Sequence, residues 1–329
     1  MNVVYGAGSW GTTLAIVQAR KGQPVTLLAR DVTEMERLRS AGENTRFLPG
    51  VPFPAKLVVS SDHGSLKGAE TLTLAVPSAT VAGALDRLAQ AIERSTIVVS
   101  ASKGLLQTES GPARLSELIG DRLPNPVCAL SGPNLAREIA RGLPATTVVA
   151  SNDAEAAAAA QRLYTDSSFR VYTSTDVVGV ELAGALKNVV ALAVGAADGM
   201  NQGDNAKAAL ITRGLAEIGR VGRELGAEPL TFAGLAGLGD LVATCASPFS
   251  RNRRLGEHLA AGRGLEEAQR ELGQVAEGVP TTRAAVELGR RLGVEMPIAE
   301  QMHAVLFEGK QPRQAVLDLM QRELKSERD

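Results

Sequence analysis

The chain has 329 residues, enough for two domains and a sizeable buried core. Its 35 basic and 36 acidic residues leave a formal charge of −1, so it lacks the basic excess that marks nucleic-acid-binding and membrane-surface proteins. We therefore expect a small-molecule substrate and no nucleic-acid partner.

The first half of the chain alternates β-branched runs with helix-forming segments. Several of the runs are apolar without alternation, as in parallel strands that are buried on both faces. The pattern predicts a doubly wound, Rossmann-type parallel sheet domain of the α/β class over residues 1–174. Its strands are expected at 2–5, 24–29, 71–76, 96–102, 126–132, 145–151 and 169–173, and helices at 9–22, 78–94 and 153–164.

The hexapeptide GAGSWG at residues 6–11 is a G-x-G-x-x-G between the first strand and the first helix. Gly6 permits the tight turn, Gly8 lets a pyrophosphate approach the backbone, and Gly11 lets the helix pack closely on the strand. The helix N-terminus offers free N–H groups to the anion. The context predicts a dinucleotide site, with a glycine-rich turn that binds nothing as the alternative.

The second strand ends in Arg30 and Asp31, where cofactor preference is decided. An acidic residue there binds the ribose 2′-hydroxyl of NAD, whereas an arginine accommodates the 2′-phosphate of NADP. We expect NADP through Arg30, with NAD left open through Asp31. The alternative is that Arg30 is a solvated side chain at a strand end and binds no cofactor.

Polar residues also follow two further strands. Lys103 comes directly after strand 96–102, and Gly132, Asn134 and Ala136 follow the strand that begins at residue 126. Ligands of open α/β sheets lie beyond the carboxyl ends of the strands. Each residue alone could belong to an ordinary loop, but together they mark the edge where a nicotinamide ring would lie.

After residue 174 the β-branched runs stop. Glycine and proline then punctuate a series of helical patterns. The sequence predicts an all-α C-terminal domain over residues 175–329. Its helices are expected at 177–197, 206–225, 231–243, 251–261, 265–272, 280–292, 297–307 and 312–325.

The first of these helices carries Lys187 and Asn188 inside the most apolar stretch of the chain, residues 177–199. An ammonium buried without partners is costly or loses its proton. We therefore expect Lys187 to have a buried partner and a chemical role. A second polar cluster in an apolar setting lies at 203–214.

A third polar cluster lies within residues 234–256. Asp240 and Thr244 are spaced i, i+4, so both face one way on a helix. Ser250 is placed to cap the next helix, which opens on four polar residues, 251–254. Backbone N–H groups and guanidinium forks together suit a phosphate, whereas the bland alternative is a solvated basic turn.

The two cysteines, Cys128 and Cys245, lack CxxC spacing, which favours reduced thiols and predicts no metal site. The N-terminal residues lack the basic segment and apolar core of a signal peptide. Polar residues interrupt the longest apolar stretch, so we expect no membrane insertion. These features together predict a cytoplasmic protein.

A series of motifs in fixed order resembles the bacterial-type NAD(P)-dependent glycerol-3-phosphate dehydrogenases. The resemblance covers nearly the whole chain, and its Lys-Asn and Ser-Arg-Asn-Arg motifs are specific to that family, unlike the glycine fingerprint. The sequence departs from the family at Asn134 and Leu135, where Ser or Thr followed by Phe is usual. The motifs are GAGSWGTTLA, NTRFLPG, AVPS, SKG, SGPNLAREIA, ELAGALKNVVALAVG, NAKAALITRG, AGLGDLVATC, SRNRRLG and VAEGVPTT.

The resemblance implies reversible reduction of dihydroxyacetone phosphate to sn-glycerol 3-phosphate by NADPH or NADH, feeding phospholipid synthesis. It makes Lys187 the general acid–base, with Lys103 and Asp240 as its catalytic partners, and a homodimer is left open. Matched to the family motifs, the substrate positions are Lys103, Gly132, Asn134, Lys187, Asn188, Asp240, Ser250, Arg251 and Asn252. The cofactor positions are Gly6, Gly8, Ser9, Trp10, Gly11, Arg30, Lys103, Ala136, Arg251, Val275 and Glu277.

Two other functions remain open at this stage. A β-hydroxyacid dehydrogenase also pairs a Rossmann domain with helices and uses a helical lysine followed by asparagine, but the basic cluster at 251–254 favours a phosphorylated triose. A dinucleotide-sensing protein without turnover would not need Lys187, Lys103 and Asp240 together. Oxidation of the reduced cofactor with each candidate substrate separates the three.

Overall fold

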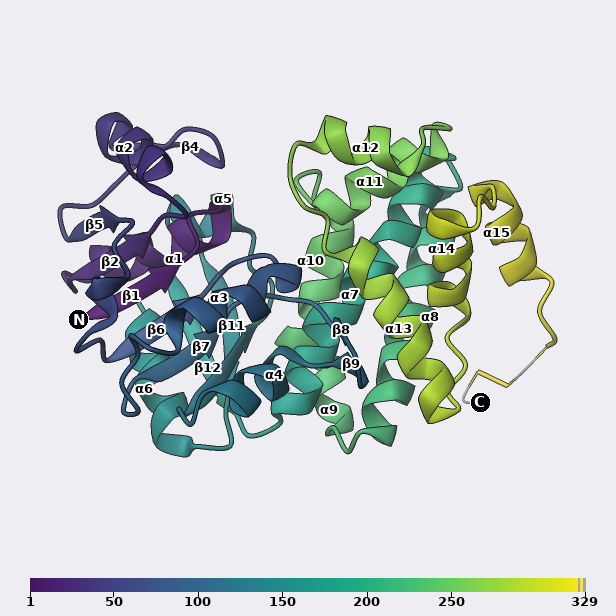
Figure 1. Ribbon diagram of the computed structural model, residues 1–329. Helices are drawn as coiled ribbons and strands as arrows, with labels where there is room; N and C mark the ends of the chain where they lie inside the picture. The colour runs from purple at the N-terminus through teal and green to yellow at the C-terminus, as the bar shows by residue number, and fades with distance from the viewer. Residues whose placement is uncertain (325, 328–329) are drawn as a thin grey trace.

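The structure, a computed structural model, describes residues 1–324 and 326–327 (Figure 1). An eight-stranded sheet with helices on both faces forms the N-terminal part, and helices gathered around the long α7 form the C-terminal part. The predicted fold class is confirmed. The domain boundary after residue 174 stays a prediction.

The large sheet has the strand order β12-β11-β10-β7-β6-β1-β2-β5. Two short hairpins, β3–β4 and β8–β9, lie outside it. The strands of the large sheet are β1 (Asn2–Tyr5), β2 (Val25–Leu28), β5 (Leu57–Ser60), β6 (Thr71–Leu74), β7 (Ile97–Ser100), β10 (Val127–Ser131), β11 (Ala145–Ala150) and β12 (Phe169–Ser174). The hairpin strands are β3 (Glu43–Asn44), β4 (Leu48–Pro52), β8 (Leu106–Thr108) and β9 (Gly111–Ala113).

The sheet is predominantly parallel, as predicted, but it contains one antiparallel pair that the sequence did not indicate. β10 and β11 pair antiparallel, and β12 runs parallel to β11, so the last two strands run against the rest. A parallel return needs a crossover that spans the sheet. The helix between β10 and β11 is α5 (Ala136–Ala140), only five residues long, so the chain turns back beside β10 instead.

Apolar side chains of the helices pack on both faces of the sheet. α3 (Val81–Leu88) and α4 (Leu115–Arg122) cover one face, and α1 (Ser9–Arg20) and α6 (Ala154–Tyr164) cover the other. The predicted helix 78–94 is shorter than expected, because it opens with the 3-10 turn η2 (Ser78–Thr80) and α3 ends at Leu88. The sequence did not predict α2 (Val32–Ala41), α4, α5 or the 3-10 turn η1 (His63–Leu66).

The helical part follows the predicted series with one break. The expected helix 231–243 divides into α9 (Pro229–Ala233), a π-helical turn η3 (Leu235–Gly239) and α10 (Asp240–Ala246). A Cβ on Gly237 would lie 2.1 Å from the Phe232 carbonyl oxygen, so this turn requires a glycine at that position. The turn sets the start of α10, and hence Asp240.

The remaining helices lie close to their predicted bounds. The last predicted helix, 312–325, ends early at Met320, and its final residue, 325, lies outside the described residues. The remaining helices are α7 (Val177–Gly199), α8 (Gly203–Glu224), α11 (Arg251–Ala260), α12 (Leu265–Leu272), α13 (Gly278–Leu292), α14 (Pro297–Phe307) and α15 (Pro312–Met320).

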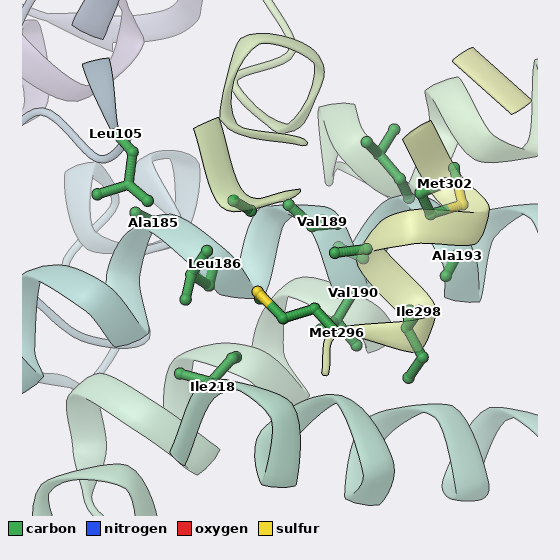
Figure 2. Close-up of a cluster of buried hydrophobic side chains, with 14 of the residues drawn as sticks. Leu105, Ala185, Leu186, Val189, Val190, Ala193, Ile218, Met296, Ile298 and Met302 are labelled. Carbon is green, nitrogen blue, oxygen red and sulfur yellow. The ribbon is translucent and has the colours of Figure 1, made fainter. Parts of the chain in front are cut away.

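The apolar composition of α7 reflects its position at the centre of the helical core. Every residue from Leu182 to Ala197 is buried. Figure 2 shows α7 side chains packed against Ile218 of α8 and against Ile298 and Met302 of α14. By length and hydropathy α7 and the segment Pro229–Ala246 could each cross a membrane, but the apolar window of α7 is 89% buried inside the protein.

Glycines bring α11 unusually close to α7. A Cβ on Gly195 would lie 1.9 Å from the Arg253 carbonyl oxygen, and one on Gly256 would lie 2.1 Å from the Leu192 carbonyl oxygen. Both helices therefore need a glycine at the crossing. The contact places the start of α11 beside the middle of α7, where Lys187 and Asn188 lie.

Candidate active site

The glycine-rich turn between β1 and α1 has the geometry of a dinucleotide site. Gly6 has φ +113°, and a Cβ on Gly11 would lie 1.9 Å from the Gly6 carbonyl oxygen, so neither position accepts a side chain. A Cβ on Gly8 would meet nothing within 4 Å, which leaves the backbone open to a close ligand. Gly8 also leaves the N-terminus of α1 without a side-chain cap. The turn therefore fits a pyrophosphate.

Ser9 and Trp10 form the first turn of α1. The Trp10 ring packs edge-on against Phe169, with ring centroids 6.5 Å apart. Within the described residues the Trp10 indole Nε1 is buried without a hydrogen-bond partner. Ala136 lies nearby, because its carbonyl oxygen accepts a hydrogen bond from Thr13 Oγ1 of α1 at 3.1 Å.

Arg30 and Asp31 lie just after β2, as predicted, but they differ in their exposure and in the contacts that they make. Asp31 caps α2 by accepting the Glu34 N–H at 2.8 Å, and this bond and the Arg30 guanidinium lower its pKa. The Arg30 side chain is 79% exposed and touches Asp31 at 3.1 Å. Arg30 thus presents an exposed guanidinium that pairs with Asp31, whereas Asp31 also caps a helix.

Lys187 has the buried partners that its setting requires. Its Nζ donates to Asp240 Oδ1 at 2.5 Å and to Thr244 Oγ1 at 2.6 Å. Lys187, Asp240 and Thr244 are all buried. The i, i+4 spacing of Asp240 and Thr244 on α10 therefore aims both acceptors at the same ammonium.

Lys103 shares the carboxylate of Asp240. Its Nζ donates to Asp240 Oδ2 at 2.8 Å and to the Gly132 carbonyl oxygen at 2.9 Å. Gly132 has φ +155°, and a Cβ there would lie 2.9 Å from Thr147 Cα. One buried carboxylate thus holds two lysines, one from the sheet edge and one from α7.

Burial lowers the pKa of Lys187 to about 8; the Asp240 carboxylate opposes this shift and the neighbouring Lys103 charge adds to it. A lysine that titrates near neutrality is suited to give and take a proton. The structure thereby explains how a lysine is tolerated in the most apolar helix of the chain.

Asn188 and Asn252 connect α7 to the start of α11. Asn252 Nδ2 donates to Asn188 Oδ1 at 2.8 Å, and Asn252 Oδ1 accepts the Gly278 N–H at 2.9 Å. Ser250 caps α11 by accepting the Arg253 N–H at 3.3 Å. These bonds hold the N-terminus of α11 beside the lysine pair.

Arg251 opens α11 and Glu277 lies across from it. Part of the Arg251 side chain is exposed to solvent. Protein atoms packed around its guanidinium lower the pKa of that group, and the charge of Glu277 opposes the shift. Glu277 accepts hydrogen bonds from Ser78 N at 2.9 Å and Ser78 Oγ at 2.5 Å. Val275, two residues before it, is 48% exposed.

Asn134 retains hydrogen-bonding capacity at the position where the sequence departs from the family motif. Its Nδ2 donates to Thr147 Oγ1 at 3.0 Å. Among the described residues, its buried Oδ1 has no hydrogen-bond partner. Asn134 Oδ1 is therefore a buried and unsatisfied acceptor at the sheet edge.

The structure separates the second polar cluster from the lysine pair. Lys207 pairs with Asp198 at 2.9 Å, about three helical turns beyond Lys187 on α7. Arg253 contacts the same carboxylate at 2.8 Å. Within residues 1–324 and 326–327, no group of three or more His, Cys, Asp or Glu side chains is placed to hold a metal ion.

Sequence reasoning missed two groups of contacts around the site. Ser78 was not linked to Glu277, and Arg114 and Ser116 were not linked to Glu181 of α7. The AVPS motif drew attention to Ser78, and Glu181 interrupts an apolar stretch. Neither signal names a partner, because the pairs lie 65 or more residues apart.

Comparison with known proteins identifies two family models on the chain. Residues 3–157 match the NAD-dependent glycerol-3-phosphate dehydrogenase N-terminus and residues 176–317 match the corresponding C-terminus. The chain is 48% identical over 325 residues to a glycerol-3-phosphate dehydrogenase [NAD(P)+] of Desulfitobacterium hafniense, covering 98% of this chain and 92% of the relative. A Geobacter sulfurreducens protein of the same name is 49% identical over 331 residues, covering 99% and 98%.

A solved structure agrees with these matches. The crystal structure of glycerol-3-phosphate dehydrogenase from Coxiella burnetii superposes with a TM-score of 0.94 at 40% identity, covering 97% of this chain and 98% of that one. Family models, relatives and architecture therefore agree over nearly the full length. The chain belongs to the NAD-dependent glycerol-3-phosphate dehydrogenase family.

Proposed function

We propose that the chain is an NAD(P)-dependent glycerol-3-phosphate dehydrogenase (EC 1.1.1.94) that reversibly reduces dihydroxyacetone phosphate to sn-glycerol 3-phosphate and supplies glycerophospholipid synthesis. The observation that carries the proposal is the buried Lys187–Asp240–Lys103 group beside the basic start of α11. The family match favours this activity over the β-hydroxyacid alternative. A sensing protein without turnover would not need Lys187, Lys103 and Asp240 together.

Lys187 is the proton donor in the reducing direction. When bound, the reduced nicotinamide supplies a hydride to C2 of the substrate, and negative charge develops on the carbonyl oxygen. The Lys187 ammonium donates a proton to that oxygen, while Asp240 fixes the direction of Nζ. Lys103 and Asn188 help to stabilise the developing oxyanion.

The start of α11 binds the substrate phosphate. Arg251 supplies a guanidinium, Ser250 and Asn252 supply polar groups, and the N-terminal end of this ten-residue helix favours an anion. Gly132 and Asn134 bind the rest of the substrate. The unpartnered Asn134 Oδ1 suits the one free hydroxyl group of dihydroxyacetone phosphate.

Arg251→Ala tests the phosphate role. We expect KM for dihydroxyacetone phosphate to rise roughly 10- to 100-fold with a much smaller change in kcat, because a lost charge-assisted contact to the non-reacting phosphate weakens ground state and transition state alike. Initial rates over a range of substrate concentrations measure it. Arg254→Ala, which removes an exposed arginine from the same turn, is the matched control. An unchanged KM in Arg251→Ala would remove the phosphate from this site.

NADPH is the preferred cofactor, through Arg30. Arg30→Ala is expected to raise KM for NADPH about tenfold and to change KM for NADH little, because only NADPH carries a 2′-phosphate. Parallel initial rates with the two cofactors provide the internal control. Equal changes for both cofactors would show that Arg30 does not read the 2′-phosphate.

The other cofactor positions and the wider setting rest on the same family pattern. We assign Gly6, Gly8, Ser9, Trp10 and Gly11 to the pyrophosphate side, and assign Lys103, Ala136, Arg251, Val275 and Glu277 to the rest of the cofactor. Residues 1–174 would form the dinucleotide domain and residues 175–329 the substrate domain. A cytoplasmic location and a homodimer complete the proposal, and light scattering of the purified chain tests the latter.

A further inference from the structure

The segment after Lys103 leaves the sheet part and packs on the helical part. Leu105 is 2% exposed and belongs to the core around α7, where Figure 2 shows it beside Ala185. The β8–β9 hairpin then extends to α13 (Figure 1). Gln107 donates to Glu287 of α13 at 2.6 Å. Lys103 is thus attached to the helical core within two residues.

The far side of the hairpin fits α13 equally closely. Arg291 of α13 donates to the Ser110 carbonyl oxygen. Gly111 has φ +114°, and a Cβ there would overlap the Arg291 guanidinium. The positive φ of Gly111 is the reason that the hairpin turn needs a glycine there.

The segment ends on a buried carboxylate of α7. The Glu181 side chain is 9% exposed. Its oxygens accept hydrogen bonds from Ser116 N at 2.8 Å, from Arg114 Nη1 at 3.0 Å and from Ser116 Oγ. Burial raises the pKa of Glu181, opposed by the bonds from Ser116 and by the charge of Arg114. These hydrogen bonds tie the end of the segment to α7.

These contacts form a closed ring of groups. Lys103 and Lys187 both donate hydrogen bonds to Asp240. Lys187 lies six residues after Glu181 on the same rigid helix, α7. Glu181 in turn binds Arg114 and Ser116, which lie on the segment that leads back to Lys103. Lys103 and Glu181 also line one small cavity, which leaves only about 10 Å³ for the centre of a water-sized sphere. That space is enough for about one water molecule.

We propose that Glu181, acting through Arg114 and Ser116, is a positioning residue that sets Lys103 against Asp240. The inference rests on the catalytic roles proposed above for Lys103 and Lys187. Glu181 touches neither lysine through a hydrogen bond; it fixes the segment that carries Lys103 to the helix that carries Lys187. Its effect on the reaction is therefore transmitted through the placement of the Lys103 ammonium.

Glu181→Gln keeps the shape of the side chain and removes the charge that holds Arg114. We expect kcat for dihydroxyacetone phosphate reduction to fall about tenfold, because a displaced Lys103 ammonium keeps only part of its effect on the reaction. The charged and titratable groups that face Lys187 are Asp240 and Cys245 of α10 and Lys103. Because the Lys103 charge lowers the pKa of Lys187, its retreat moves the basic limb of the kcat–pH profile to higher pH. A purely structural role for Glu181 would lower the urea midpoint without moving that limb.

Glu117→Gln is the matched control. Glu117 accepts from the same arginine, Nη2 at 2.6 Å and the backbone N–H at 2.8 Å, but its side chain is 48% exposed. We expect Glu117→Gln to keep wild-type kcat and to leave the basic limb of the kcat–pH profile in place. Ser116→Ala, which removes only a hydroxyl donor to Glu181, provides a second and milder variant and is expected to move the limb in the same direction.

A double-mutant cycle with Lys103→Met tests whether Glu181 affects the reaction through Lys103. If Glu181 acts through Lys103, adding Glu181→Gln to Lys103→Met lowers kcat little further. If the two substitutions act independently, their fold-losses in kcat multiply in the double variant, and that result would overturn the inference. If Lys103→Met lowers kcat while Glu181→Gln and Ser116→Ala leave kcat and the limb unchanged, this inference alone fails. If Lys103→Met and Lys187→Ala both keep wild-type kcat, the proposed catalytic roles fail first.

Discussion

Replacing Lys187 with alanine is expected to lower kcat for dihydroxyacetone phosphate reduction by about 10²- to 10⁴-fold, the range that a positioned general acid contributes. NADPH binding should change little, because Lys187 is not among the residues assigned to the cofactor. Oxidation of NADPH followed by absorbance gives kcat, and a fluorescence titration gives the dissociation constant of NADPH.

Lys207→Ala is the control for the loss of a paired lysine from the helical part of the chain. Lys207 pairs with Asp198 at 2.9 Å and takes no part in the Asp240 group. We expect near wild-type kcat for this variant. A Lys187→Ala enzyme with near wild-type kcat would remove Lys187 from the reaction, whatever Lys207→Ala does.

Asp240→Asn is expected to lower kcat about 100-fold and to move the basic limb of the kcat–pH profile to lower pH. The neutral amide no longer offsets burial or the Lys103 charge, and both of these lower the pKa of Lys187. The ammonium that donates the proton is present below that pKa and is lost as pH rises through it. Kcat measured across pH 6 to 10 tests the direction, where about pH 8 marks the wild-type limb.

Asp198→Asn supplies the matched control for Asp240→Asn. Asp198 also bridges two cations, Lys207 at 2.9 Å and Arg253 at 2.8 Å, but it lies away from Lys187. We expect this variant to keep the wild-type limb. A limb that stays in place or moves to higher pH in Asp240→Asn would contradict the assigned role of the carboxylate.

The strongly apolar and strongly periodic elements could be predicted from the sequence. The helices 265–272 and 297–307 have their predicted bounds, and the buried central strands lie where β-branched runs were found. By contrast, α2 buries only Leu38, so it lacks the apolar stripe that indicates a helix. Its caps, Asp31 and the left-handed Gly42, were the readable signals.

Strand direction could not be predicted from local sequence. β11 is as apolar as its neighbours, yet it runs antiparallel to β10 because the intervening helix α5 is so short. The hairpin β8–β9 was also missed. Its three-residue strands pack on α13 rather than on the large sheet, so their burial depends on a helix some 170 residues later in the chain.

The candidate site was predictable as a set of residues but not as a geometry. A lysine in an apolar helix demands a buried partner, and the i, i+4 pair Asp240 and Thr244 was the best local indication of one. That Lys103 shares the same carboxylate, or that Glu181 binds Ser116, depends on tertiary packing. No spacing in the sequence encodes those contacts.

The pH dependence of kcat for dihydroxyacetone phosphate reduction, in wild type and in Lys187→Ala, tests the central claim most directly. If the buried Lys187 ammonium is the proton donor, wild-type kcat falls as pH rises through about 8, and the residual activity of Lys187→Ala shows no limb there. A limb near pH 8 that survives intact in Lys187→Ala would assign the titrating group to another residue and contradict the account.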